Sequence, residues 1–167
     1  MKVKNVMSPI TDSLSPEDTL QRAVVKLRTS IRRDIPGVKG LVVPGVKGLV
    51  VLNEVGELVG ILTIKDVLRA TIPVYLDTKL AKFSWDGMLE EMARRVACRK
   101  VKEFMSTKVL TVSEEAPLMT CADLLIQEKM QRLPVIGKDN KVVGIVYIRD
   151  IFNVISQIFL DQEECKL

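Results

Sequence analysis

Two short stretches of the sequence combine a glycine, a hydroxyl-bearing side chain, a basic residue and a carboxylate at the same spacing. GILTIKD begins at Gly60, and GIVYIRD begins at Gly144. A carboxylate near the start of a helix can accept two hydrogen bonds from a cis-diol, and the helix N-terminus itself favours phosphate. Glycine lets the backbone approach a ligand closely. This combination indicates binding of a phosphorylated diol.

Eight residues in these stretches are candidates for ligand binding. They are Gly60, Thr63, Lys65 and Asp66 in the first stretch, and Gly144, Tyr147, Arg149 and Asp150 in the second. The basic residue before each aspartate can neutralise phosphate charge.

A second interpretation of the first stretch needs no ligand. Thr63-x-x-Asp66 is also a capping box, in which the threonine caps the helix and the aspartate returns to the N-cap amide. Tyr147 cannot cap a helix as threonine does, so Asp150 lacks its local partner, although it can still bond an N-terminal amide alone. Both interpretations stay open at this point.

The composition argues against most catalytic and metal chemistry. Histidine is absent, which excludes Ser/His/Asp and Cys/His catalysis, and no carboxylate or lysine constellation stands out. Cys98, Cys121 and Cys165 are scattered, with no CxxC, so neither a zinc site nor a disulfide framework is expected. We therefore expect no catalytic residues, no metal and no enzymatic activity, and we expect Cys121 to be core filler.

Charge and hydropathy limit the cellular location and the classes of partner that we expect. The formal net charge is +4 and aromatic residues make up 4% of the chain, with no basic patch interleaved with aromatic residues, so nucleic acid is not a favoured partner. The N-terminus has no apolar signal core, and no apolar run approaches the roughly 20 residues that span a bilayer. The sequence predicts a cytoplasmic protein with no membrane segment.

An internal repeat must position the candidate residues. VKNVMS at 3–8 matches VKEFMS at 101–106, SPEDTLQRAVVKL at 15–27 matches SEEAPLMTCADLL at 113–125, and LVGILTIKDVL at 58–68 matches VVGIVYIRDIF at 142–152. Each copy reads as an extended segment, a helix, two strands and a helix. The prediction is an α+β fold (α/β-like) made of two β-α-β-β-α repeats that share a core.

Local patterns within the copies predict where the elements begin. Ser15 is the expected N-cap of the first helix, with Pro16 at its first position, and Ser113 caps the matching helix. Hairpin turns are expected at Asn53 to Gly56 and at Lys138 to Asn140. The nearly continuous aliphatic runs beside these turns suggest strands buried on both faces.

Two features lie outside the simple repeat. The octapeptide PGVKGLVV at 36–43 recurs letter for letter at 44–51, either through a real duplication or through an error in the sequence. Between the copies, a helix is expected over WDGMLEEMARRVACRK, capped by Ser84 or Asp86. It carries a basic stretch opposed only by Glu91. A solvated helix face is the default interpretation of such a stretch, and an anion-binding role is the alternative. The basic residues are Arg94, Arg95, Arg99, Lys100 and Lys102.

The two copies, each entered through V-K-x-h-M-S and closed by G-h-h-T/Y-h-x-D-h, resemble a tandem pair of CBS domains, or Bateman module. The corresponding boundaries are repeat 1 over 1–70, a helical linker over 71–100 and repeat 2 over 101–167. The resemblance implies that the repeats pack sheet to sheet with pseudo-two-fold symmetry and leave two clefts between them.

The resemblance also implies the ligand. Adenine nucleotides (AMP, ADP or ATP) or S-adenosylmethionine commonly bind in such clefts, with the motif threonine on phosphate or ribose and the motif aspartate on the ribose hydroxyls. Carried over, the first cleft uses Gly60, Thr63 and Asp66 and borrows the loop around Thr111. The second uses Gly144 and Asp150 and borrows the loop around Ser13. Tyr147 departs from the pattern and either stacks on a base or, as its bulk favours, plugs the cleft.

The leading hypothesis is a regulatory module without catalytic activity that binds an adenosine-type nucleotide and signals by conformational change to an unidentified partner protein. The alternative is a ligand-free interaction scaffold in which the aspartates only cap helices. A homodimer is expected in either case, with no tightly bound cofactor. Binding of RNA or DNA through the basic stretch is the least favoured hypothesis.

Overall fold

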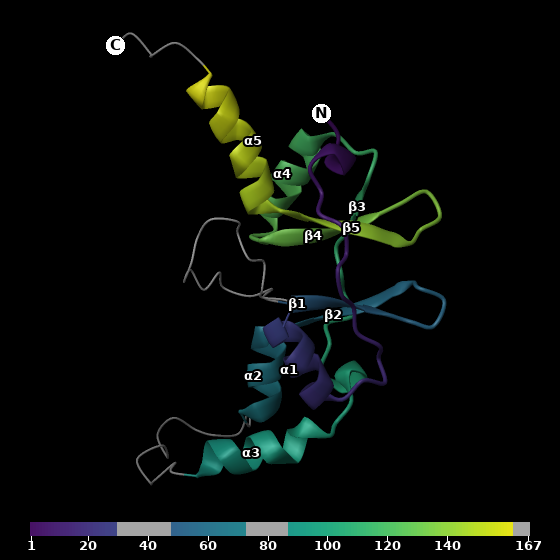
Figure 1. Cartoon of the computed structure of the whole chain (residues 1–167), viewed down its shortest axis with the longest axis vertical. Coiled ribbons are helices and arrows are strands. Elements are labelled where there is room, and N and C mark those ends of the chain that lie inside the picture. The colour runs from purple at the N-terminus through teal and green to yellow at the C-terminus, as the bar shows by residue number, and fades with distance from the viewer. Residues whose placement is uncertain (30–47, 73–86, 162–167) are drawn as a thin grey trace. The chain divides into compact units, whose positions relative to one another are not determined.

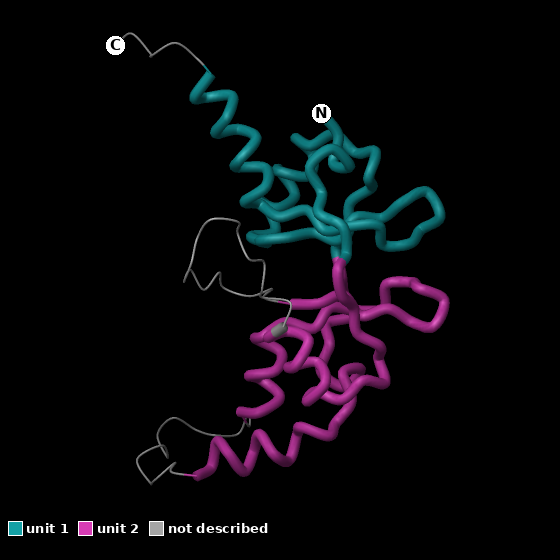
Figure 2. Tube along the Cα trace, viewed as in Figure 1, with its two compact units in different colours: residues 1–10, 110–167 teal, residues 11–109 magenta. Residues whose placement is uncertain are grey.

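The computed structural model describes residues 1–29, 48–72 and 87–161, which form two compact units. Unit 1 contains residues 1–10 and 110–167, and unit 2 contains residues 11–109 (Figure 2). Each unit combines helices with a small sheet (Figure 1), which confirms the predicted α+β class. The predicted packing of one sheet on the other stays a prediction.

Unit 2 is built around one hairpin. Strands β1 (Gly48–Leu52) and β2 (Leu58–Thr63) pair antiparallel, and Leu14 adds a parallel bridge to Val51. Three helices and a 3-10 turn accompany the hairpin: α1 (Leu20–Thr29), α2 (Ile64–Thr71), α3 (Met88–Ala97) and η2 (Val101–Glu103).

Unit 1 repeats this plan with a short third strand in place of the single bridge. Strand β3 (Val112–Ser113) runs parallel to β4 (Arg132–Ile136), which pairs antiparallel with β5 (Val142–Tyr147). The accompanying elements are η1 (Val3–Asn5), α4 (Leu118–Gln127) and α5 (Ile148–Leu160). The turns that close the two hairpins lie where the sequence predicts them, and their left-handed positions are taken by Gly56 and Asn140.

The cores of the two units consist of matching residues. The core of unit 2 includes Leu14, Leu20, Ala23, Leu27, Leu49, Val51, Leu62 and Val101, and that of unit 1 includes Val112, Leu118, Cys121, Leu125, Leu133, Val135, Val146 and Val3. Cys121 is fully buried, as predicted. Burial of apolar surface by these aliphatic side chains is the main driving force for folding in both units.

The VK segments, residues 3–8 and 101–106, are exchanged between the copies. Val3 packs in the core of unit 1, and its amide donates to the carbonyl of Ala116. Val101 packs in the core of unit 2, and its amide donates to the carbonyl of Asp18. The start of each sequence repeat therefore completes the unit that contains the rest of the other repeat.

Several local expectations were wrong. Helix α1 begins at Leu20 rather than after Ser15, because the Asp18 carboxylate accepts from the Ser15 amide and holds residues 15–18 in a turn. Helix α4 likewise begins at Leu118 and not after Ser113, which belongs to β3. Strands β1 and β4 are largely buried, but β2 and β5 alternate between buried and half-buried positions.

Other expectations fall on residues that are not described. The first octapeptide at 36–43 lies outside the described residues, whereas the second supplies Gly48–Val51 of β1. Ser84 and Asp86, the expected caps of α3, also lie outside them. Helix α3 starts at Met88, after Gly87 in a left-handed conformation.

Candidate functional site: the two strand-to-helix junctions

In unit 2, strand β2 passes directly into helix α2 at Thr63. The Thr63 amide and hydroxyl both donate to Oδ2 of Asp66 at 2.8 Å, and the Asp66 amide donates to Oγ1 of Thr63 at 3.3 Å. Asp66 is 6% exposed. This arrangement is the predicted capping box, and it occupies Oδ2 of Asp66 without any ligand.

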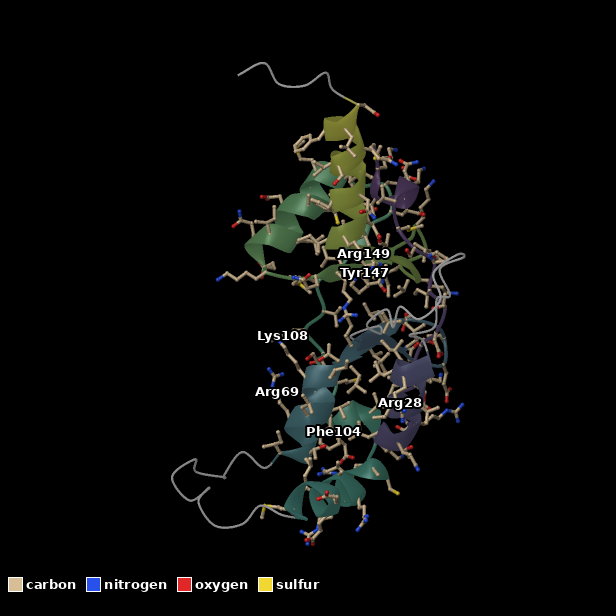
Figure 3. All side chains as sticks on the ribbon, turned by 60° about the vertical axis from the view of Figure 1, so that its left-hand side comes forward. Arg28, Arg69, Phe104, Lys108, Tyr147 and Arg149 are labelled. Atoms are coloured by element: carbon tan, nitrogen blue, oxygen red, sulfur yellow. The ribbon has the colours of Figure 1, made fainter. Side chains whose placement is uncertain are left out.

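The second oxygen of Asp66 faces a cation of its own helix. The Arg69 guanidinium lies 3.4 Å from Oδ1 of Asp66, although the Arg69 side chain is largely exposed (Figure 3). Lys65 is exposed, and no contact to the Asp66 carboxylate is found for it among the described residues. Both oxygens of Asp66 therefore have partners within unit 2.

In unit 1, strand β5 passes into helix α5 at Tyr147 in the same way, but the capping contacts are missing. Tyr147 makes no side-chain hydrogen bond to the helix end. Within the described parts of the chain, the buried Oδ2 of Asp150 has no hydrogen-bond partner. Its Oδ1 lies 3.8 Å from Nε of Arg149, beyond hydrogen-bonding distance.

Two arginines accompany Tyr147. The Arg149 guanidinium lies over the Tyr147 ring at 5.8 Å from the centroid, and Figure 3 shows both residues at the start of α5. Arg132 is the cross-strand partner of Tyr147. At the matching position of unit 2, Gly48 is the cross-strand partner of Thr63. Burial lowers the pKa of Arg132 from its ordinary value, and the neighbouring Tyr147 opposes that shift.

The motif glycines have a packing role. A Cβ on Gly60 would lie 2.7 Å from Sδ of Met105, and a Cβ on Gly144 would lie 2.8 Å from the carbonyl oxygen of Ser8. Both contacts come from VK segments, which bridge to the residue after each glycine: Ser106 to Ile61, and Ser8 to Ile145. The close approach of the VK segments explains why glycine occupies both positions. Contact of these glycines with a ligand stays a prediction.

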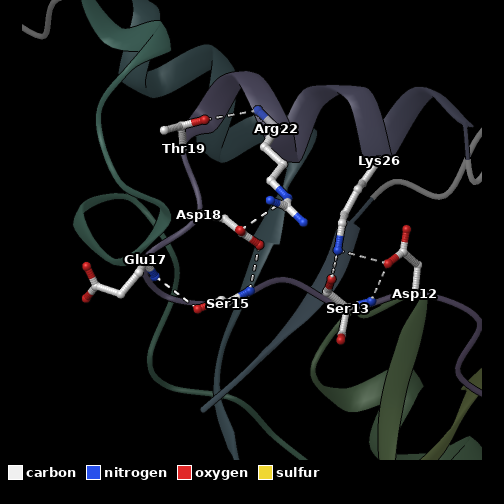
Figure 4. Close-up of polar contacts among 8 residues, drawn as sticks. All are labelled: Asp12, Ser13, Ser15, Glu17, Asp18, Thr19, Arg22 and Lys26. Atoms are coloured by element: carbon white, nitrogen blue, oxygen red, sulfur yellow. Dashed lines mark hydrogen bonds and ion pairs between the residues drawn. The ribbon is translucent and has the colours of Figure 1, made fainter. Parts of the chain in front are cut away.

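Ser13 and Thr111, the predicted borrowed residues, lie in different units. The Ser13 amide donates to Oδ1 of Asp12, and its carbonyl accepts from Nζ of Lys26 at 2.6 Å (Figure 4). Thr111 is exposed just before β3. Ser13 thus shares a unit with Asp66, and Thr111 shares one with Asp150. The cross-pairing that the family resemblance implies stays a prediction.

The basic stretch is more fully paired than the sequence suggested. Glu91 pairs with Arg95 at 2.5 Å, and Glu103 pairs with Arg99 at 2.9 Å. Lys100 and Lys102 both pair with Glu17, and their hydrogen bonds lower the pKa of Glu17 to about 2. The expectation of a single opposing Glu91 was wrong, which weakens the case for a free anion-binding surface here.

The same ion-pair arrangement recurs in unit 1. Glu115 pairs with Lys2 and Lys4 at 2.6 Å each, and these hydrogen bonds lower the pKa of Glu115 to about 2. The sequence signal was the K-x-K pattern around each VK segment together with a glutamate at the matching position of each copy. Sequence reasoning missed these ion pairs because their partners are more than eighty residues apart.

The described ranges hold neither a metal-binding cluster nor a membrane-spanning helix. No cluster of three or more Cys, Asp or Glu side chains suited to a metal ion occurs in them. Within the same ranges, no helix has the length and apolar character required to cross a membrane.

Comparisons with known proteins agree with the repeat. The CBS domain family model matches residues 3–72 and 101–157. An uncharacterized protein of Methanocaldococcus jannaschii is 24% identical over 117 residues, which cover 62% of this chain and 70% of that protein.

Solved structures share the fold at low identity. CBSX2, a CBS-pair protein from Arabidopsis thaliana, matches with a TM-score of 0.71 at 22% identity over 96% of this chain and 98% of that one. The same protein has been solved in complex with AMP. The cytosolic domain of the Mg2+ channel MgtE, in complex with ATP, matches with a TM-score of 0.61 at 20% identity over 92% of this chain and 48% of that one.

Proposed function

The chain belongs to the CBS domain family, and from that premise we propose that it is a non-catalytic regulatory module that binds an adenine nucleotide. The observation that carries the proposal is the junction present in both units, where a hairpin strand runs into a helix with a carboxylate in its first turn. Complexes of CBSX2 with AMP and of the MgtE domain with ATP support this ligand class.

The chemistry of the junction suits a ribonucleotide. A carboxylate in the first turn accepts hydrogen bonds from ribose hydroxyls, and the helix N-terminus and the adjacent Lys65 or Arg149 favour phosphate. Regulation requires that the nucleotide bind two conformations of the protein with different affinity, since equal affinity shifts no equilibrium. The regulated partner is a protein outside this chain, and the site of action is the cytoplasm.

The test is calorimetric titration of the nucleotide-free protein with AMP, ADP, ATP and S-adenosylmethionine. We expect saturable binding of at least one adenine nucleotide, because all three offer both the diol and phosphate. Binding of S-adenosylmethionine alone would replace the proposed ligand class by one without phosphate. Absence of binding by all four compounds would contradict the proposal.

One observation favours the alternative function, a ligand-free scaffold. The Thr63–Asp66 capping box is complete without a ligand, so this junction has a purely structural explanation. If neither junction binds a nucleotide, the chain acts through its surfaces alone. A pull-down of partner proteins that is unaffected by nucleotide would support the scaffold, whereas capture that depends on nucleotide would exclude it.

We also propose that the chain forms a homodimer, with α5 in the interface. Phe152, Ile155 and Phe159 lie on one side of this helix at helical spacing, and these residues are 66%, 41% and 72% exposed in the single chain. Such an apolar surface is commonly an interaction site. Sedimentation velocity should show a dimer that Phe152→Glu weakens, and an unchanged monomer for both proteins would contradict this assignment.

A further inference from the structure

Helices α4 and α5 of unit 1 each carry an apolar stripe in addition to the residues that they bury in the core, such as Cys121 and Ile151. Both stripes have the same spacing, i, i+3 and i+7. Met119 is 81% exposed and Ile126 is 65% exposed, so the α4 stripe lies largely outside the core, as the α5 stripe does. The stripes consist of Met119, Ala122 and Ile126 on α4 and of Phe152, Ile155 and Phe159 on α5.

The arrangement of these two helices is that of half a helix bundle. Helices α4 and α5 contact each other and run in opposite directions (Figure 1). Apolar positions separated by three and four residues form the seam through which helices pack side by side. In a four-helix bundle, antiparallel helices bury such seams against one another. A second pair of helices would therefore bury both stripes.

The first helix of unit 2 lacks the matching stripe. By the internal repeat, Gln21 on α1 corresponds to Met119 on α4, and Arg28 corresponds to Ile126. Gln21 and Arg28 are both exposed. Two exposed apolar side chains of unit 1 are thus replaced in unit 2 by an amide and a cation, which lose nothing by staying in water.

The last helix of the hairpin in unit 2 is shorter than its counterpart and is flanked by charge. Helix α2 exposes Ile64, Leu68 and Ile72, but Lys65 and Arg69 lie beside them and are also exposed. Helix α2 has 8 residues, whereas α5 has 13, so α2 offers more than one turn less for packing. The two units therefore present surfaces of different chemistry at matching helices.

A second copy of unit 1 is the partner that suits the stripes. None of the stripe side chains is ionisable, so two identical surfaces can meet without bringing like charges together. The same contact between two copies of unit 2 would bring Arg28, Lys65 and Arg69 close to their own counterparts. A two-fold interface uses the same patch on both copies, and aromatic side chains such as Phe152 and Phe159 are typical of interface cores.

We propose that two copies of this chain associate unit 1 to unit 1, with the α4 and α5 stripes of both copies forming a four-helix interface about a two-fold axis. The matching helices of unit 2 contribute no comparable apolar contact. This inference rests on the homodimer proposed above. It goes further by adding α4 to the interface and by assigning the self-association to one of the two units.

The first test is sedimentation velocity of the full chain over a concentration series. Phe152→Glu and Met119→Glu, one on each helix, should each raise the dimer Kd roughly tenfold or more, because a carboxylate would be buried in an apolar interface. Leu68→Glu is the matched control, since Leu68 is the counterpart of Phe152 and is 53% exposed. It should change the Kd by less than about twofold.

Charge substitutions are used because an alanine at a stripe position such as Ile126 keeps the surface apolar and has a smaller effect. All three substituted residues are exposed in the single chain, so the variants should keep their fold. Far-UV circular dichroism identical to that of the unsubstituted chain checks this. A variant that fails to fold is replaced by glutamate at Phe159, for which the same rise in Kd is expected.

The second test distinguishes unit 1 on unit 1 from unit 1 on unit 2. Ile155 lies in the middle of the α5 stripe, where two facing stripes bring the residue closest to its counterpart. Ile155→Glu and Ile155→Lys should each weaken association, and a mixture of the two should associate at least about tenfold more tightly than either alone, because opposite charges then face each other. A mixture that associates no better than its components would overturn the unit 1 to unit 1 contact.

The remaining outcomes separate the inference from the proposals on which it rests. A monomeric unsubstituted chain would overturn both the homodimer and this inference, while nucleotide binding is measured independently by calorimetry. A dimer weakened by Phe152→Glu but not by Met119→Glu would leave α5 in the interface and overturn the role of α4. Equal weakening by Leu68→Glu and Phe152→Glu would overturn the assignment to unit 1 alone.

Discussion

Unit 1 and unit 2 have matching cores and diverging junctions. Leu27 and Leu125 occupy the same place in the two cores, as do Leu62 and Val146, and all four are buried. At the junctions, by contrast, Thr63 is replaced by Tyr147 and the strand neighbour changes from Gly48 to Arg132. The matched core positions exchange only small or medium apolar side chains for one another, whereas the junction has accepted a change of chemistry.

The largest effects should come from the matched cores, where the two units are expected to behave alike. Leu27→Ala and Leu125→Ala should each lower the free energy of unfolding by about 2–5 kcal/mol, because each removes a buried side chain and leaves a cavity. Urea denaturation measures both. Ile126→Ala, at a side chain that is 65% exposed, is the control and should change stability by no more than about 0.5 kcal/mol. A small effect at Leu125 alone would break the equivalence of the cores.

Substitution of the motif glycines should lower stability by a smaller amount, and by different amounts in the two units. Gly144→Ala brings a methyl against the backbone oxygen of Ser8, and should cost about 1–3 kcal/mol. Gly60→Ala meets the flexible thioether of Met105 first and should cost less. Thermal unfolding without nucleotide tests this. If both variants keep full stability and lose only nucleotide binding, the glycines serve the ligand and not the VK segments.

The junction itself should respond differently in each unit. Thr63→Ala should lower the free energy of unfolding by about 1 kcal/mol, because the capping box loses its hydroxyl. Tyr147→Phe should change it by no more than about 0.5 kcal/mol, because the phenol makes no cap bond. Chemical denaturation of both variants makes the comparison. A larger loss for Tyr147→Phe would show that the phenol has a structural partner outside the helix cap.

The smallest effects should come from the exposed ion pairs of Glu17 and Glu115. Both carboxyls have a pKa lowered to about 2 by lysine hydrogen bonds, so their stabilising contribution is complete above the ordinary glutamate pKa and is lost as the pH falls toward 2. Glu17→Gln and Glu115→Gln should therefore be slightly destabilising at neutral pH. The difference from the unsubstituted protein should shrink on acidification and in high salt. A difference that grows on acidification would contradict this origin.

Much of the fold followed from periodic patterns in the sequence. The internal repeat predicted the same elements in both copies, the aliphatic runs with Asn-x-x-Gly and Lys-Asp-Asn turns predicted both hairpins, and Thr63-x-x-Asp66 predicted the capping box. These are local features, in which neighbours along the chain determine the conformation.

The features that sequence reasoning missed depend on competing or distant contacts. Ser15 has the residue type of an N-cap, but its amide donates to the Asp18 carboxylate within a turn. The helix begins only after Thr19, whose hydroxyl accepts a hydrogen bond from the Arg22 amide (Figure 4). The partners of Glu17 and Glu115 and the buried, unpartnered oxygen of Asp150 depend on tertiary contacts. The sequence indicated that Asp150 lacks the threonine partner that Asp66 has. It could not show whether a backbone amide at the start of the helix donates to Asp150 instead.

The exchange of VK segments has a consequence for how the protein is made. Residues 11–109 form a unit from one continuous span, which can assemble as soon as that span has left the ribosome. Unit 1 instead joins residues 1–10 to a segment that begins at residue 110, so its η1 segment cannot pack until that later segment has been synthesised. Contacts of such long sequence separation form slowly. We therefore expect unit 2 to fold first during synthesis and unit 1 to close last.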